Sequence, residues 1–414
     1  MPTTHDPGST PSATLDLGDP DLIADPYPTL AELRESAPIT YDERLGVWLL
    51  TRFDDVHQAL RDRRLGRQFR QRYTEKEFGQ PPLDPRWASF HEHERWSLLF
   101  LEPPDHTRLR RLVSKVFTPR AVASIEPLVR GIATDIVADL AERDHFDLIA
   151  DYAQPYSVSV ICSMLGLPLA DGSQLLEWSH DIVKMYEPDA SGDQRTQADR
   201  SAGEFIDYTR DIIADKRARP DDLLVSQLVR VRDDGDVLSD AEIASTTMVL
   251  LEAGHEATVN GLANGMRALL DRPAQYRAVA TGDVRAADAV EEMLRFDSPV
   301  QLFERWVLEH DVEIAGQAVP FGATIAMLFG SAQRDPRRFD RPDDFDVRRG
   351  GDTGHIGFGG GIHFCVGAPL ARAELAVSVE LLTSQFPDLR LAATPTHHPT
   401  FVIRGYQSLD LVPR

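Results

Sequence analysis

Cys365 and His363, two positions before it, have types and spacing that could do chemistry. They lie in residues 354–372, GHIGFGGGIHFCVGAPLAR, where three consecutive glycines precede the cysteine and a helical pattern follows it. A zinc site needs about four ligands, and no second cysteine pair accompanies this one. A dinucleotide fingerprint is also excluded, because the third glycine of the G-x-G-x-x-G spacing does not fall in place. A nucleophilic thiol with His363 as its base stays open as a weaker alternative.

An axial thiolate ligand to haem iron accounts for every feature of this segment. Glycines let the backbone come close to a flat macrocycle, because they carry no side chain. The N-terminus of the helix that follows would stabilise a negatively charged sulfur. The other cysteine, Cys162, lies in the apolar helical stretch SVSVICSMLGLP and is predicted to be a buried structural thiol.

The segment resembles the haem-binding signature of the cytochrome P-450 monooxygenases, and the resemblance extends from about Asp19 to the C-terminus. It implies the cytochrome P-450 fold, which is mainly α with small β-sheets. It also implies haem b, iron protoporphyrin IX, as the cofactor, with Cys365 as the axial ligand of the iron. The residues that match the signature are Phe358, Gly359, Gly361, His363, Cys365 and Gly367.

The resemblance assigns further cofactor contacts outside the cysteine segment. Residues 105–110, DHTRLR, resemble the segment whose histidine and second arginine bind the haem propionates. His106 and Arg110 are four positions apart and therefore share one helical face. Together with Arg305 and His363 they are expected to bind the two propionates through charge-assisted hydrogen bonds.

A second matching feature is architectural. Glu292 and Arg295 resemble the family's Glu-x-x-Arg pair, whose spacing lets a carboxylate and a guanidinium meet on one helix. With Arg348 or Arg349 they are expected to form a buried charge network that braces the haem loop.

Residues 241–266, AEIASTTMVLLEAGHEATVNGLANGM, resemble the long helix that crosses over haem in this family. Ala253 and Gly254 would leave room for dioxygen, and Glu256 would supply protons. The family's usual threonine is replaced by Ala257, and the threonine comes next, at Thr258. At about 100° per residue, Thr258 is expected to point away from the face of Ala257.

Two hypotheses account for Ala257. Either a substrate hydroxyl, or a water that it holds, completes the proton relay, or the enzyme performs a less ordinary oxidation such as the coupling of aromatic rings. Glu252 stands where the family commonly has an apolar residue, and it is expected to border the pocket and to prefer a substrate amine or hydroxyl. A salt bridge to a neighbouring helix is the alternative.

Other pocket walls are implied by the resemblance alone. Ala253 on the long helix, Val300 in the segment 300–303 and Phe401 in the segment 400–402 are expected to contact the substrate. An irregular stretch rich in aromatic residues, about 66–101, is expected to be a lid, or else a surface loop pinned by its rings.

The composition is typical of a globular protein, and its negative charge argues against a general affinity for nucleic acid or anionic lipid. The 414 residues include 44 basic and 66 acidic side chains, so the formal net charge is -22. Helical periodicity dominates, with short β patterns near residues 39–51, 307–329 and 400–412. We expect a disordered tail over residues 1–15, a single domain over residues 16–414, and a cytoplasmic location, because the N-terminus is polar.

The chain has no room for a reductase domain beside this one, so electrons are expected to come from NAD(P)H through a separate ferredoxin and ferredoxin reductase. Their docking site is expected to be a basic patch of Arg108, Arg111, Lys115, Arg120 and Arg372.

The expected activity is insertion of one oxygen atom of O2 into a small organic molecule, by hydroxylation or epoxidation. Only four of the basic residues are lysines, which is typical of actinobacterial coding sequence. This arginine-rich composition and Ala257 favour a role in natural-product tailoring, and a monomer is expected. A non-catalytic haem-thiolate sensor or carrier, and peroxide-driven chemistry, are the rivals.

Overall fold

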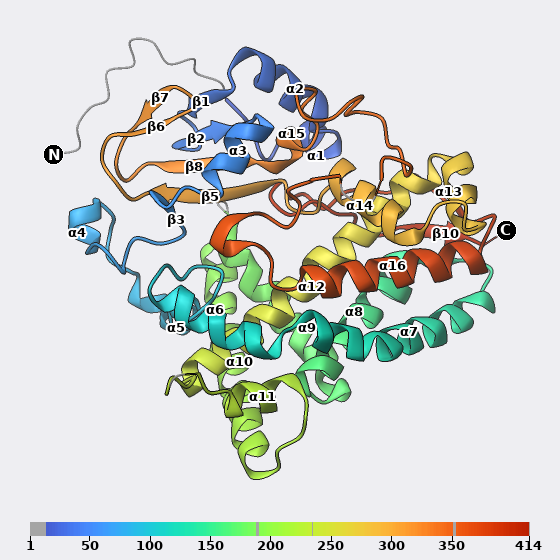
Figure 1. The fold of residues 1–414 in the computed structure, drawn as a ribbon, viewed down its shortest axis with the longest axis horizontal. Helices are drawn as coiled ribbons and strands as arrows, with labels where there is room; N and C mark the ends of the chain where they lie inside the picture. The colour runs from blue at the N-terminus through green and yellow to red at the C-terminus, as the bar shows by residue number, and fades with distance from the viewer. Residues whose placement is uncertain (1–13, 188–189, 234, 351–352, 414) are drawn as a thin grey trace.

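The computed structural model describes residues 14–187, 190–233, 235–350 and 353–413. Helices make up most of it, and the prediction of a mainly α protein with small β-sheets is confirmed (Figure 1). The helices are α1 Pro20–Ala24, α2 Tyr27–Ser36, α3 Phe53–Ala59, α4 Glu75–Phe78, α5 Ala88–Arg95, α6 Asp105–Val116, α7 Pro119–Ala141, α8 Gln154–Leu165, α9 Gly172–Val183, α10 Gly192–Ala218, α11 Leu224–Arg230, α12 Asp240–Leu270, α13 Pro273–Ala280, α14 Ala286–Phe296, α15 Phe329–Ala332 and α16 Ala368–Gln385.

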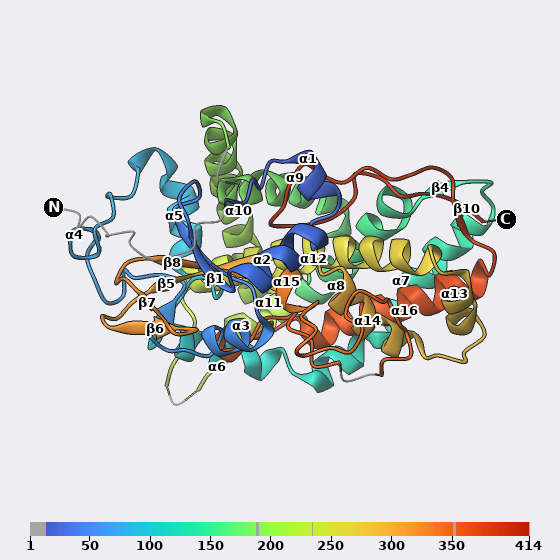
Figure 2. The ribbon, with the colours of Figure 1, turned by 90° about the horizontal axis from the view of Figure 1, so that it is seen from above.

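The strands form three separate sheets. A five-stranded sheet has the order β1-β2-β8-β5-β3, with β2 and β8 parallel and the other neighbours antiparallel. Strands β4, β10 and β9 form a small antiparallel sheet at the other end of the molecule, and β6 pairs with β7 (Figure 2). The strands are β1 Ile39–Asp42, β2 Val47–Leu50, β3 Leu65–Gly66, β4 Phe146–Asp147, β5 Leu302–Val307, β6 Val312–Ile314, β7 Gln317–Val319, β8 Thr324–Leu328, β9 Arg390–Leu391 and β10 Asp410–Val412.

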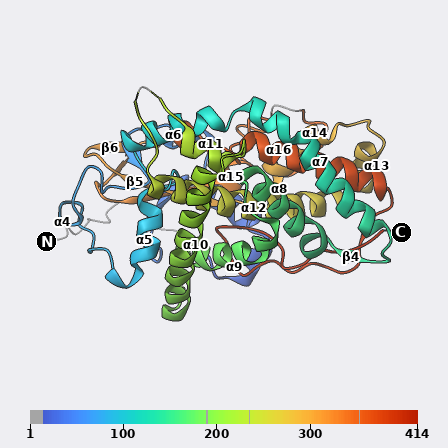
Figure 3. The same ribbon diagram turned by 90° about the horizontal axis from the view of Figure 1, so that it is seen from below.

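Helix α12 runs through the middle of the helical part, as Figure 3 shows from below. Ser239 and Glu242 form a capping box that satisfies backbone N–H groups at its start, and the helix contains no proline. Most of its 31 residues are buried around the whole circumference, because helices pack against it on several sides. It is therefore a fixed element against which a site can be built.

The chain reaches the start of α16 directly after Cys365. Pro369 stands in the first turn of this helix, where the missing N–H costs no hydrogen bond. Helix α16 packs against α7, α12 and α14. The sulfur of Cys365 is thus placed by the same packing that holds α12.

The N-terminal boundary differs from the prediction. Residues 1–13 of the expected tail lie outside the described residues, but Leu15 is buried. Its backbone N–H donates to Oδ2 of Asp42, 2.6 Å away, so hydrophobic packing and this bond place Leu15 in the folded domain. Within the described residues, no helix has both the length and the apolar character needed to cross a bilayer.

Candidate active site

A cavity lies between α12 and the cysteine segment, and residues from both line it. The wall from α12 is made of small or apolar side chains, while the opposite wall is largely glycine backbone. The lining residues include Leu98, Leu99, Val249, Leu250, Ala253, Gly254, Ala257, Thr258, Val300, Arg305, Gly357, Phe358, Gly359, Gly360, His363, Phe364, Cys365, Gly367 and Glu374, together with Arg110 of α6. Such a cavity suits a flat, mostly apolar molecule that has one polar end.

Cys365 borders this cavity, whereas Cys162 is fully buried within α8. The backbone N–H of Cys365 donates to the carbonyl oxygen of Phe358, 3.0 Å away, which closes the loop. Burial raises the pKa of the Cys365 thiol, while backbone N–H groups of Gly367 and Ala368 and the charge of Arg110 act in the opposite direction. The N–H groups therefore favour a thiolate here, and a metal cation would complete its stabilisation.

Two glycines give the cysteine loop its shape. Gly359 and Gly361 have φ angles of +69° and +66°, which side-chain-bearing residues rarely adopt. A Cβ atom on Gly361 would lie 2.2 Å from the carbonyl oxygen of Leu60. The loop can therefore lie against the end of α3 only with glycine at this position.

Arg110, Arg305 and His363 line the cavity, and His106 lies beside His363. Nη1 of Arg305 and Nε2 of His106 are buried and have no hydrogen-bond partner in the described part of the chain. Burial and the nearby Arg67 lower the pKa of Arg305 to about 9, and burial with the nearby His363 lowers the pKa of His106 to about 4. The charge of the nearby Glu102 acts in the opposite direction on both groups but does not outweigh burial.

The remaining two donors have protein partners. Nε2 of His363 lies 3.2 Å from Oε1 of Glu102, and its ring centroid lies 4.5 Å from that of His106. Arg110 donates from Nη2 to the carbonyl oxygen of Phe364, 2.7 Å away. Unpaired donors on Arg305 and His106 beside these groups fit a cofactor with two carboxylates, as haem has.

The face of α12 toward the cavity carries Ala253, Gly254, Ala257 and Thr258. On a helical wheel these four residues fall within about 140°. Thr258 lines the cavity together with Ala257, although about 100° separates the two on the helical wheel, because the cavity spans a wide enough arc to include both. Ala253 and Gly254 border the cavity as expected.

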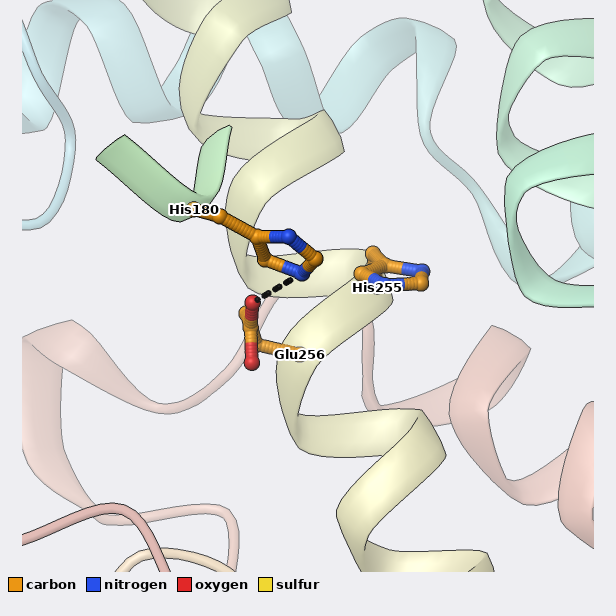
Figure 4. A group of neighbouring side chains, drawn as sticks. All are labelled: His180, His255 and Glu256. Carbon is orange, nitrogen blue, oxygen red and sulfur yellow. Dashed lines mark ion pairs between the residues drawn. The ribbon is translucent and has the colours of Figure 1, made fainter. Parts of the chain in front are cut away.

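His255 and Glu256 lie on the side of the same turn that faces away from the cavity, and neither of them lines it. Oε1 of Glu256 lies 3.1 Å from Nε2 of His180, which belongs to α9 (Figure 4). The hydrogen bond that His180 donates to Glu256 raises the pKa of His180. Burial would raise the pKa of Glu256, but the bond and charge of His180 outweigh it and lower this pKa. The Glu256 carboxylate thus faces α9, which offers it a charged partner, and its role as a proton source stays a prediction.

Two of the expected pocket residues lie elsewhere. Oε2 of Glu252 lies 3.4 Å from Nε2 of His93 on α5, so the alternative of an interhelical ion pair holds and Glu252 does not line the cavity. Phe401 is buried in an apolar cluster with Leu302 and Leu328 on the five-stranded sheet, because that sheet face needs covering. Val300 and Ala253 do line the cavity.

The expected charge network is present. Arg295 donates from Nε and Nη2 to Glu292 at 2.7 and 2.8 Å, and both side chains are almost completely buried. Nε of Arg349, and not Arg348, donates to Glu292 at 3.1 Å. Arg295 also donates to the carbonyl oxygens of Gln333 and Pro342. The network ties α14 to the segment that leads into the cysteine loop.

The rings of the aromatic stretch, about residues 66–101, do not line the cavity. Phe69 and Phe78 stack at 4.2 Å between ring centroids in a cluster that also includes Leu308. Leu98 and Leu99 line the cavity instead. The rings therefore pin the loop to the sheet, which was the alternative reading of this stretch.

Sequence reasoning missed Glu374 on α16. It borders the cavity, is buried, and its Oε2 has no hydrogen-bond partner among the described residues. Burial raises the pKa of Glu374 well above its usual range, because a low-polarity environment favours the neutral carboxyl. A lone glutamate within an otherwise apolar helical face was the available signal.

The expected basic patch is mostly neutralised. Arg108 pairs with Glu242, and Lys115 pairs with Asp233. Arg111 lies 2.8 Å from Asp233, and Arg372 lies 2.6 Å from Glu291. Arg120 is exposed. Acidic partners on neighbouring elements, which sequence spacing does not reveal, remove most of the positive charge.

Comparison with known proteins places the chain in a family. The cytochrome P-450 family model matches residues 71–281 and 286–390. The cytochrome P-450 monooxygenase PikC of Streptomyces venezuelae is 37% identical over 417 residues, covering 98% of this chain and 95% of PikC. The 6-deoxyerythronolide B hydroxylase of Saccharopolyspora erythraea is 38% identical over 386 residues, covering 91% and 92% of the two chains.

Solved structures agree with this placement. The crystal structure of P450BioI in complex with an acyl carrier protein superposes with a TM-score of 0.88 at 29% identity, covering 95% of this chain and 99% of that one. The crystal structure of CalO2 gives a TM-score of 0.87 at 32% identity, covering 96% and 98%. Haem is the cofactor of the family that these comparisons identify, and the donor set described above fits it. This chain belongs to the cytochrome P-450 family and is a haem-dependent monooxygenase.

Proposed function

We propose that Cys365 is the axial ligand of the haem iron and that Arg110, Arg305, His106 and His363 bind its carboxylates. The observation that carries this proposal is the cavity itself, with a cysteine on one wall and unpaired buried donors at one edge. Phe358 and Gly367 would contact the same group. Glu292, Arg295 and Arg349 would hold the loop in place from behind.

Haem bound here would supply the activation of dioxygen and the transfer of one of its oxygen atoms to the substrate. The residues of this chain shape where that chemistry happens. Ala253, Gly254 and Ala257 leave space above the cysteine wall, and apolar side chains such as Leu250 exclude water.

Proton delivery would involve Glu256, although its carboxylate faces His180 on the outward side of α12. Ala257 provides no hydroxyl to link that carboxylate to the cavity. The link would then come from a hydroxyl of the substrate or from Thr258, which borders the cavity. Hydrogen-bonded groups of this kind pass protons efficiently when they lie within bonding distance.

The substrate class that fits is an oxygenated natural product. The 6-deoxyerythronolide B hydroxylase and the polyketide biosynthesis cytochrome P450 PksS of Bacillus subtilis are relatives at 38% and 34% identity, and their names refer to polyketide chemistry. The cavity of this chain offers an apolar wall with few polar groups beyond Thr258 and the cationic edge. A largely apolar molecule with a hydroxyl near the oxidised carbon matches that wall.

Electrons would come from NAD(P)H through a separate ferredoxin and its reductase. Support comes from the relatives, because the matches to PikC and 6-deoxyerythronolide B hydroxylase cover 95% and 92% of those chains. A reductase domain fused to either relative would have left much of its length unmatched. With Arg108, Arg111, Lys115 and Arg372 paired, docking would depend on apolar contact through Phe364, which is 41% exposed beside Cys365.

The test compares two cysteine variants of the haem-loaded protein. Cys365→Ser is expected to abolish the thiolate band in the carbon monoxide difference spectrum of the reduced protein. Cys162→Ser is the matched control, because Cys162 is buried within α8, and its spectrum is expected to stay unchanged. A thiolate band that survives in Cys365→Ser would overturn the proposal.

Titration of the haem-loaded protein with hydroxylated polyketides and their deoxy analogues, followed at the Soret band, then tests the substrate class.

A further inference from the structure

A group of three ligand-type side chains lies between α9 and the side of α12 that faces away from the cavity. His255 and Glu256 come from α12, and His180 reaches them from α9 (Figure 4). One ligand atom from each residue lies within 4.8 Å of those of the other two. Within the described residues, this is the one group of at least three His, Cys, Asp or Glu side chains with such spacing.

His255 provides a separate observation. Its side chain is 1% exposed, and its Nδ1 atom has no hydrogen-bond partner in the described part of the chain. The ring lies beside that of His180, with centroids 5.8 Å apart. A buried ring nitrogen without a partner is unfavourable, so its presence beside two other ligand-type groups points to a missing binding partner.

The protein itself does not offer that partner. Glu256 already accepts from His180, and the nearby Asp181 is occupied by Lys184 and Ser201, at 2.9 Å each. Nδ1 of His255 forms no hydrogen bond with either acid in the described part of the chain.

We propose that His180, His255 and Glu256 form a binding site for a divalent transition-metal ion of the zinc type. Two imidazoles and one carboxylate are ligands that Zn²⁺ prefers, at bond lengths of about 2.0–2.2 Å. Tetrahedral geometry at these lengths separates ligand atoms by roughly 3.3 Å, so rotations of the side chains close the group around an ion.

Access and coordination number are consistent with this site. The side chain of His180 is 43% exposed and that of Glu256 is 25% exposed, which gives the ion an entry path from solvent. Three protein ligands leave a fourth position for water on that side. The ion would link α9 to α12, because one of its ligands, His180, comes from α9 and the other two come from α12.

The site has a consequence for turnover that rests on the proposed function. A zinc ion bound to the Glu256 carboxylate would withdraw it from proton delivery. Zinc would therefore slow the coupled reaction at concentrations that saturate the site. Zinc binding itself is tested without any measurement of turnover.

The experiment uses haem-loaded full-length protein that has been treated with a chelator and then freed of it. Isothermal titration with Zn²⁺, together with metal analysis after dialysis, is expected to show one ion per chain. His180→Ala is expected to weaken the affinity at least tenfold, and its half-exposed position lets the variant fold. Glu256→Gln is expected to weaken it similarly.

His145→Ala is the matched control, because this ring is 68% exposed and lies 4.0 Å from Asp410, away from α9. Its zinc affinity is expected to equal that of the unmodified protein. Absence of zinc binding, or an unchanged affinity in His180→Ala, would overturn the site. The carbon monoxide spectrum of the same zinc-free samples reports on the proposed function separately, so the two failures are distinguishable. Tight binding without any effect on turnover would overturn the consequence for Glu256.

Discussion

Nε2 of His93, on α5, lies 3.4 Å from Oε2 of Glu252, on α12, and both side chains are almost completely buried. Burial alone would lower the pKa of His93, but the charge of Glu252 outweighs it and raises this pKa above its usual 6.5. The pair connects the helix of the aromatic stretch to the central helix. It is therefore an electrostatic contribution to the packing of α5.

A pH dependence follows from this pair. Because the folded-state pKa of His93 is raised, its contribution is fully present below the unfolded-state pKa of about 6.5 and is lost as the pH rises through the raised value. The difference in unfolding free energy between the unmodified protein and Glu252→Gln is thus expected to be larger at about pH 6 than at about pH 9. Urea unfolding at both values measures it. An equal difference at both pH values would contradict the prediction, and His145→Gln is the control with an exposed ring.

Ala257→Thr tests the substrate-assisted relay. The new hydroxyl would border the cavity, so deoxy substrates are expected to show several-fold better coupling of NADH consumption to product. Hydroxylated substrates are expected to gain little, because they already provide the group. Thr258→Ala is the companion variant, and a loss of coupling with both substrate types would assign the relay to Thr258. Coupling that is the same in both variants and in the unmodified protein, with both substrate types, would contradict the substrate-assisted relay.

Glu292→Gln is expected to destabilise the protein by about 3–5 kcal/mol, because it leaves Arg295 and Arg349 with an uncompensated buried charge. Denaturant unfolding and haem content are the measurements. Arg285→Ala serves as the control, since Arg285 is 77% exposed and its pair with Asp288 lies at the surface. Comparable losses in both variants would show that the network does not brace the loop.

Gly361→Ala is expected to reduce haem retention and stability more than Gly282→Ala. Both glycines have positive φ angles, +66° and +78°, so both substitutions carry a backbone cost of about 1–2 kcal/mol. Only at Gly361 does the added Cβ meet a backbone atom, the carbonyl oxygen of Leu60 at 2.2 Å. Haem content after gel filtration and the urea midpoint compare the two. Equal effects would show that the close approach to Leu60 does not matter.

Local sequence spacing was enough for the parts of the site that lie within one segment. The loop around Cys365 was predictable because glycines, cysteine and helix start follow one another within a few residues. The contact of Glu292 with Arg295 was predictable for the same reason, since three positions on a helix define a shared face. The mainly α fold followed from periodicity.

Tertiary structure alone decided which partner each outward side chain meets. A helical wheel gives the angle between Ala257 and Glu256, but it does not say that α9 brings His180 to one side and a cavity opens on the other. Glu252 and Phe401 were assigned to the pocket for this reason, and they pack instead against α5 and against the sheet. The sequence predicted a basic patch that includes Arg108, Lys115 and Arg372. In the structure, carboxylates distant along the chain neutralise these three side chains. Sequence determines the chemistry that each segment carries, whereas packing between distant segments determines the direction in which that chemistry faces.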